Sequence, residues 1–293
     1  PLRRPSLCLA LLALLMMATT APAPGPAVPL WPGGALPDGA RQGQLPALTA
    51  YIPASNPTKT AVVICPGGAY HAMALDWEGV LVAQWFNQHH VAAFVLQYRH
   101  GDGHHYPQPI DDGRRAVRWV REHAKTYQLD PQHIGIMGFS AGGHVAATVS
   151  THYDPKTALL HDAVGQASAR PDFTILAYPV ITMDEAFTHL DSREHLIGLH
   201  PSPALVHELS NETQVTAETP PAFIYVTDAD TLVPPENSIA YYLALHRQHV
   251  PAELHVFRTG KHGSGLGQHE PLLSIWPELL DRWMAGLGYM EQG

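Results

Sequence analysis

The most constraining feature of this chain is a series of short, continuous apolar runs separated by longer segments with helical periodicity. Such runs are typical of strands buried on both faces of a sheet, because a half-exposed strand alternates apolar and polar residues. Strands that alternate with helices predict an α/β fold, with a mostly parallel central sheet covered by helices on both faces. The runs lie at residues 60–65, 91–98, 133–139, 172–180, 222–228 and 252–257.

The remaining segments complete this prediction. Residues 47–52 are expected to form an edge strand, and the polar stretch 184–218 to form short helices beside the site, so no large cap domain is expected. No repeat or internal linker interrupts the pattern, which predicts one catalytic domain over residues 45–293. The expected helices lie at 78–90, 111–127, 141–151, 238–249 and 272–286, the last interrupted by Pro277.

The first residues have the pattern of a secretory signal peptide. Arg3 and Arg4 precede an apolar run at 7–18, which is followed by small and proline residues and is too short to span a bilayer. We therefore expect a signal peptide at residues 1–23, a Pro/Gly-rich linker at 24–44, and a secreted, periplasmic or extracellular product. No later run is long enough to span a bilayer, so stable membrane insertion is not expected.

Composition argues against nucleic acid as a partner. The formal net charge is −9, whereas binding to a phosphate backbone requires a positive surface. Four arginines, Arg114, Arg115, Arg118 and Arg121, recur at helical spacing and predict a solvated or salt-bridged helix face. Nothing in the composition indicates an oligomeric state.

A candidate nucleophile lies where the run 133–139 meets the next helix. The sequence there is Gly138-Phe139-Ser140-Ala141-Gly142, which matches the G-x-S-x-G pattern of a nucleophile elbow. In that turn the serine hydroxyl stands clear of the sheet at a helix N-terminus, and the N–H of Ala141 can face an oxyanion. The alternative is an ordinary serine in a tight turn, and the rest of the sequence must decide.

A base and an acid follow in the order that such a serine requires. His262 lies in a glycine-rich loop between the run 252–257 and the last helix. Asp228 ends the run at 222–228 and Asp230 follows it, and both are candidates for the acid. A serine hydroxyl needs a base, and the base needs a carboxylate to hold its tautomer. The chain order serine, acid, histidine is that of the α/β-hydrolase triad.

Several segments together resemble the α/β-hydrolase-fold serine esterases, and above all the secreted bacterial carbohydrate esterases of the acetyl-xylan and feruloyl esterase type. The resemblance covers residues 45–290 and implies the α/β-hydrolase fold, with Ser140, Asp230 and His262 as the triad. Asp230 is chosen because the family has Val-Pro shortly after this aspartate. The segments are "VVICPGGAYHAM", "IGIMGFSAGGHVAA", "TDADTLVPPENSIAYYLAL" and "ELHVFRTGKHGSGLG".

The resemblance also implies an oxyanion hole. Related esterases have His-Gly-Gly-Gly where this chain has Pro66-Gly67-Gly68-Ala69. The missing histidine is tolerable because backbone N–H groups bind the oxyanion. Gly68 or Ala69, together with Ala141, are therefore the expected donors.

Aromatic residues beside the expected site indicate a sugar as part of the substrate. Tyr70 and Trp77 follow the oxyanion loop, and Tyr98 ends the next apolar run. The alternative is that Trp77 begins a packed helix and Tyr98 fills the core. His144, on the helix after Ser140, is expected to pack or cap rather than to act as the base.

These expectations combine into a serine esterase that hydrolyses short-chain acyl esters, O-acetyl groups on xylan-type polysaccharide above all, through an acyl-enzyme. The mechanism requires no metal and no cofactor. The alternatives are a feruloyl esterase, a lipase, a serine peptidase of the same fold, and a non-catalytic binding protein. A lipase would be expected to have a more apolar lid, the peptidases usually carry an additional domain, and a binding protein normally lacks a triad member.

Overall fold

The centre of the molecule is one sheet of eight strands in the order β1-β2-β4-β3-β5-β6-β7-β8. It is seen in a computed structural model that describes residues 23–31, 45–103, 105–153 and 162–291. β1 and β2 run antiparallel to their neighbours, and every other pair is parallel. The strands are β1 (Ala27–Pro29), β2 (Ala47–Tyr51), β3 (Ala61–Cys65), β4 (Ala92–Gln97), β5 (Ile134–Phe139), β6 (Thr174–Ala177), β7 (Ala222–Thr227) and β8 (Ala252–Phe257).

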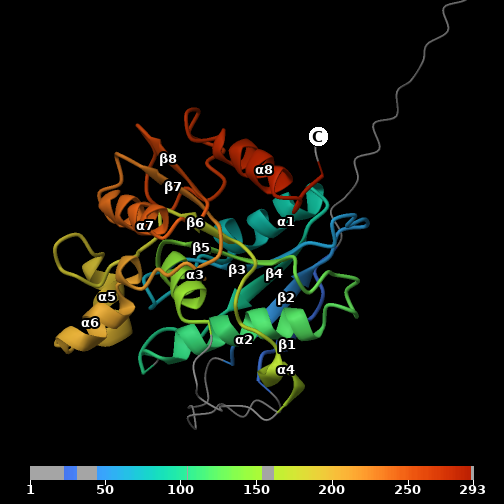
Figure 1. The fold of residues 1–293 in the computed structure, drawn as a ribbon, viewed down its shortest axis with the longest axis horizontal. Coiled ribbons are helices and arrows are strands. Elements are labelled where there is room, and N and C mark those ends of the chain that lie inside the picture. Colours follow the sequence, from blue (N-terminus) through green and yellow to red (C-terminus); the bar gives the residue numbers. More distant parts are fainter. Residues whose placement is uncertain (1–22, 32–44, 104, 154–161, 292–293) are drawn as a thin grey trace, which may run out of the picture.

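Helices cover both faces of this sheet (Figure 1). α2, α3 and α7 pack on one face, and α1 and α8 pack on the other. The segment 184–218 contains the short helices α5, α6 and η3, as expected. The bounds are η2 (Leu75–Val80), α1 (Leu81–Gln88), α2 (Gln108–Glu122), α3 (Ser140–Thr151), α4 (Ala163–Gln166), α5 (Leu190–Ile197), α6 (Pro203–Leu209), η3 (Asn211–Thr213), α7 (Glu236–Arg247) and α8 (Trp276–Gly286).

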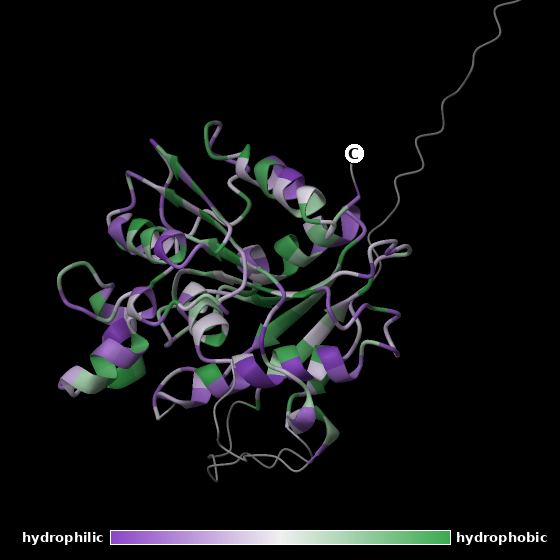
Figure 2. Ribbon diagram, viewed as in Figure 1, coloured by the Kyte–Doolittle hydropathy of each residue, from purple (hydrophilic) through white to green (hydrophobic). Residues whose placement is uncertain are grey.

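The core forms two layers, one on each side of the sheet. Every residue of β3, β5 and β7 is buried, which explains why these strands are almost continuously apolar in sequence. Figure 2 shows the apolar strands inside and the polar faces of the helices outside. The predicted α/β-hydrolase architecture is confirmed. Among the described residues, no helix combines the length and the hydropathy that crossing a membrane requires.

The prediction of a linker over 24–44 is wrong for residues 27–31. β1 pairs with β2 and becomes the edge strand in its place. Leu30 and Trp31 are buried, and Trp31 Nε1 donates a hydrogen bond of 2.8 Å to Asp112 Oδ1. The physical reason is that residues 27–31, AVPLW, are mainly apolar and can be buried. The prolines and glycines around them are typical of a linker, which is why no strand was expected. Residues 32–44 and nearly all of the predicted signal peptide lie outside the described residues.

Two helix expectations also need refinement. Pro277 does not interrupt the last helix but lies in its first turn, where the missing N–H has no intrahelical acceptor in any case. The arginine face of α2 is salt-bridged rather than solvated. Arg115 is buried and pairs with Asp162 at 2.6 Å, and Arg121 pairs with Asp172 at 2.8 Å.

Candidate active site

Ser140 lies at a sharp turn between β5 and α3. Its φ is +51°, in the left-handed region that non-glycine residues seldom adopt. The turn requires glycine on both sides, because added Cβ atoms would collide with backbone. A Cβ on Gly138 would lie 2.0 Å from the oxygen of Gly142, and one on Gly142 would lie 2.1 Å from the oxygen of Cys65. The local sequence thus folds into a strand–serine–helix elbow.

His262 joins Ser140 to Asp230. Its Nε2 lies 2.8 Å from the Ser140 Oγ, and its Nδ1 lies 2.6 Å from the Asp230 Oδ2. An ionised carboxylate can only accept, so Nδ1 carries the proton and Nε2 is left to accept the serine hydroxyl proton. This is the arrangement that activates a serine.

The two candidate aspartates differ in their surroundings. Asp230 is buried and faces His262, whereas Asp228 is exposed. The second carboxylate oxygen of Asp230 accepts the N–H groups of Leu232 and Val233, both at 3.0 Å. The turn after β7 therefore orients the carboxylate and leaves its other oxygen for the histidine.

The Pro66–Ala69 loop lies against the serine. A Cβ added to Gly67 would be only 2.9 Å from the Cβ of Ser140. Gly68 and Ala69 adopt φ values of +137° and +52°, and within the described residues no acceptor is recorded for their N–H groups. Ala141 lies in the first turn of α3, where N–H groups have no intrahelical acceptor. The Pro66–Ala69 loop and the first turn of α3 thus both lie next to Ser140, and the N–H groups of Gly68, Ala69 and Ala141 remain the predicted oxyanion donors.

Comparison with known proteins places this fold and site in a family. The BD-FAE family model matches residues 48–245, more than half of the chain. The chain belongs to the BD-FAE family.

Two relatives of this BD-FAE protein are similar to it over most of its length. It is 36% identical over 256 residues to an endo-1,4-beta-xylanase B of Butyrivibrio fibrisolvens, covering 86% of this chain and 39% of the relative. It is 35% identical over 236 residues to an acetylxylan esterase of Xylanibacter ruminicola, covering 77% of this chain and 46% of the relative. The chain therefore spans less than half the length of either relative.

A solved structure is similar over nearly the whole of both chains. An acetyl ester-xyloside bifunctional hydrolase from Caldicellulosiruptor lactoaceticus superposes with a TM-score of 0.83 at 37% identity. The match covers 90% of this chain and 97% of that one.

Two of the three aromatic residues predicted to contact substrate are buried. Tyr70 and Tyr98 are 0% and 1% exposed, and their hydroxyl groups bond at 2.7 Å to His144 Nδ1 and the Pro66 oxygen. Both side chains lie in the core, and only that of Tyr98 bonds to the Pro66–Ala69 loop, so neither is exposed to a substrate. The sequence could not separate the two roles, because a tyrosine at a strand end suits both.

Trp77 differs from these tyrosines. It is 48% exposed, on η2, beside the loop that carries His262. A Cβ added to Gly265 would lie 3.4 Å from the Cδ1 of Trp77. The indole therefore borders the BD-FAE site and offers an open apolar face.

His144 is a packing residue, as expected, and is not a second base. It is fully buried, and its Nε2 lies 2.8 Å from the Leu209 oxygen, while Nδ1 faces the Tyr70 hydroxyl. The carbonyl can only accept, so Nε2 carries a proton, and Nδ1 of the neutral ring is free to accept the Tyr70 hydroxyl. Burial lowers its pKa to about 4.

Sequence reasoning missed two residues beside the site, Glu78 and Tyr178. Both are buried and hydrogen-bonded to each other at 2.8 Å. A lone glutamate in a helical pattern is usually a surface residue, so no sequence signal marked Glu78 as part of the site.

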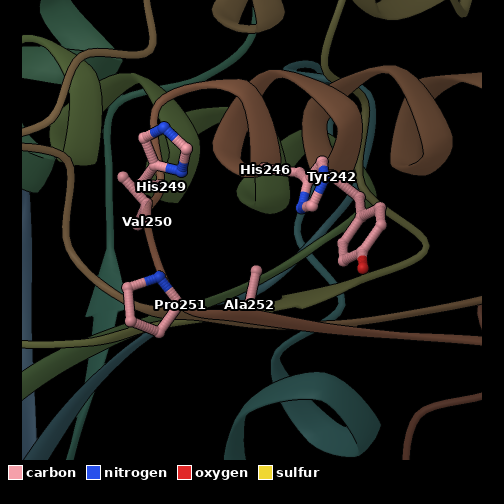
Figure 3. A pocket seen from close by; sticks show the side chains of 6 residues that line it. All are labelled: Tyr242, His246, His249, Val250, Pro251 and Ala252. Atoms are coloured by element: carbon pink, nitrogen blue, oxygen red, sulfur yellow. The ribbon is translucent and has the colours of Figure 1, made fainter.

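Other features of this BD-FAE protein lie away from the triad. A cavity of about 280 Å³ between α7 and the start of β8 is lined by Tyr242, His246, His249, Val250, Pro251 and Ala252 (Figure 3). It is at the opposite end of β8 from the loop that carries His262. In the part of the chain that the structure describes, no cluster of three or more His, Cys, Asp or Glu residues could hold a metal ion.

Proposed function

We propose that this protein is a serine esterase that removes short acyl groups, acetyl groups of xylan-type carbohydrate above all, through an acyl-enzyme. The observation that supports this proposal most strongly is the continuous chain from the Asp230 carboxylate through His262 to the Ser140 hydroxyl, at 2.6 and 2.8 Å.

The proposed reaction follows the geometry. Ser140 Oγ attacks the ester carbonyl carbon while its proton passes to His262 Nε2. Asp230 accepts the Nδ1 proton in a hydrogen bond and stabilises the imidazolium that forms. The N–H groups of Ala141 and of Gly68 or Ala69 bind the oxyanion. His262 then protonates the departing alcohol, and a water activated by the same nitrogen releases the acid.

Three observations support an acetylated carbohydrate as substrate. Relatives are named as an acetylxylan esterase and as an acetyl ester-xyloside bifunctional hydrolase. The exposed indole of Trp77 offers a sugar ring a flat apolar surface at the border of the site. The segment 184–218 contributes only short helices, which suits a bulky or polymeric substrate.

We further infer that a signal peptide at residues 1–23 exports a catalytic domain at 45–293. The support is the order of charged, apolar and small residues in the sequence. Expression with and without this segment, followed by cell fractionation, tests the inference. A full-length product found only in the cytoplasm would contradict it.

Hydrolysis of p-nitrophenyl esters and acetylated xylan tests the proposed activity. We expect the acetyl ester to be preferred over the octanoyl ester, acetate to be released from acetylated xylan, and methyl ferulate to be the poorer substrate. Ser140→Ala should lower kcat by at least about 10³-fold, because no other group can form the acyl-enzyme. A preference for octanoyl esters, or full activity in Ser140→Ala, would contradict the proposal.

A matched pair of aspartate variants tests the assignment of the acid within the same experiment. Asp230→Asn should lower kcat by about 10³- to 10⁴-fold, since the amide favours the wrong histidine tautomer. Asp228→Asn should leave kcat unchanged, because this side chain is exposed. Equal losses in the two variants would refute the choice of Asp230.

A further inference from the structure

Glu78 is a buried carboxylate that the proposed mechanism does not use. It lies on η2 and is 2% exposed. Its Oε2 accepts the N–H of Gly67 at 2.7 Å, and its Oε1 accepts the hydroxyl of Tyr178 at 2.8 Å. Within the described residues, no lysine or arginine forms a salt bridge with Glu78. Both of its oxygens are thus committed to groups beside the active site.

Tyr178 continues the connection on the other side. It follows β6, is 1% exposed, and its hydroxyl oxygen accepts the N–H of Gly265 at 2.9 Å. Gly265 lies three residues after His262 in the same loop, and its carbonyl accepts the Tyr225 hydroxyl at 3.0 Å. The ring of Tyr178 also packs edge-on against the His262 ring, with centroids 4.9 Å apart. Tyr178 therefore holds the loop that carries the proposed base.

Glu78 and Tyr178 together join two loops that are far apart in sequence. One is the Pro66–Ala69 loop, which carries the proposed oxyanion donors, and the other carries His262. The separation between the two loops must be held closely, because Gly67 is already in tight contact with Ser140. A misplacement of about 1 Å at a reacting group can cost about 10²-fold in rate.

The chemistry of this contact favours a role in the site over a role in stability alone. A carboxylate is costly to bury, and an apolar side chain of similar volume would fill the same space at lower cost. Burial raises the pKa of Glu78, whereas the hydrogen bonds from Tyr178 and Gly67 and the nearby His262 oppose this shift. What the carboxylate alone provides is two acceptor oxygens, one for the Gly67 N–H and one for the Tyr178 hydroxyl.

We propose that Glu78 is a positioning residue, which acts with Tyr178 to hold the oxyanion loop and the His262 loop in register with Ser140. This inference rests on the proposed esterase function. It assigns to the site a carboxylate that touches neither the substrate nor the reacting atoms.

Glu78→Gln is the sharpest test, because glutamine has the same shape but only one acceptor oxygen. It can satisfy Gly67 or Tyr178, and its NH₂ group then faces the other donor. Tyr178→Phe removes the same connection from the other end. Tyr241→Phe is the matched control, since Tyr241 is a buried tyrosine on α7 whose hydroxyl has no recorded partner among the described residues.

The wild-type protein, these three single variants and the Glu78→Gln/Tyr178→Phe double variant are compared by thermal unfolding and by kcat and KM on p-nitrophenyl acetate. Affinity for phenylboronic acid, which forms a tetrahedral adduct with an active serine, is measured by tryptophan fluorescence and requires no turnover. We expect kcat to fall by about 10- to 100-fold in each single variant, with KM changed by less than about threefold. Boronate affinity should fall in parallel with kcat. The kcat of the double variant should be no lower than that of the less active single variant.

Several results would overturn the inference. If Glu78→Gln and Tyr178→Phe keep the wild-type kcat and boronate affinity, the contact contributes to stability only, even if Tm is lowered. Additive losses in the double variant would show that the two residues act separately. Absence of esterase activity in the wild-type protein would instead refute the proposed function, and boronate binding would still report on Glu78.

Discussion

At the scale of single residues, exposure separates side chains that are alike in sequence. Tyr70, Tyr98 and Trp77 all follow the expected strand ends, yet only Trp77 reaches the surface. Asp228 and Asp230 are two residues apart, yet only Asp230 meets His262. Such distinctions depend on where the backbone turns, and they decide which side chain can act.

Trp77→Ala should weaken the use of carbohydrate substrates alone. We expect KM for acetylated xylo-oligosaccharides to rise roughly tenfold, equivalent to about 1.4 kcal/mol, because the sugar loses an apolar surface. The small ester p-nitrophenyl acetate should keep its KM. Leu243→Ala, at an exposed apolar residue on α7, is the control and should change neither value. Equal KM changes for both substrates would contradict a role in binding sugar.

At the scale of elements, the elbow between β5 and α3 depends on close backbone contact. α3 begins at Ser140 itself, and its first turn passes against the end of β3. The small residues near Ser140 therefore allow the helix to pack closely against the sheet. They also set where the serine hydroxyl stands.

Gly142→Ala should disrupt this approach. The added methyl group would lie 2.1 Å from the Cys65 oxygen, so α3 must shift, and we expect a loss of about 2 to 4 kcal/mol in unfolding free energy together with a lower kcat. Gly286→Ala, in α8 with nothing within 4 Å of the added atom, should instead gain at most about 1 kcal/mol. Urea unfolding of both variants measures the difference, and equal stabilities would refute the argument.

At the scale of the whole molecule, His144 connects three separate parts of the chain. Its ring joins α3 to Tyr70 after the oxyanion loop and to Leu209 at the end of α6. Burial disfavours the charged ring and lowers the pKa of His144 to about 4. The stability of the assembled fold should therefore depend on pH.

Acidification should destabilise the protein through His144. Its pKa falls from 6.5 to about 4 in the folded state, so between these values the unfolded state binds more protons. The stabilisation is complete above 6.5 and is lost as pH falls towards 4, by about 2 kcal/mol between pH 7 and pH 5. Urea unfolding at the two pH values measures the loss. His144→Gln should remove this share of the pH dependence, and an unchanged difference would assign it to other groups.

The order of most strands and helices, the turn around Ser140, and the chain order of Ser140, Asp230 and His262 could all be read from the sequence. These features are local: a buried strand is apolar throughout, an elbow needs glycines two residues from the serine, and strand ends carry the polar residues. The same local reasoning failed for residues 27–31, where four apolar residues and a proline lie among further prolines and glycines. It also failed for Pro277, which lies in the first turn of a helix that it was expected to interrupt.

Which side chains are buried and which loops meet could be learned only from the folded molecule. Burial of Tyr70 and Tyr98, exposure of Trp77 and the link from Gly67 through Glu78 to Tyr178 depend on the packing of segments that are far apart in the chain. The physical reason is that neighbours from other elements set a side chain's environment. Periodicity within one segment does not indicate which other segments pack against it. Glu78 shows this most clearly, because nothing in its own short helix indicates that Gly67 and Tyr178, from distant segments, bind and bury its carboxylate.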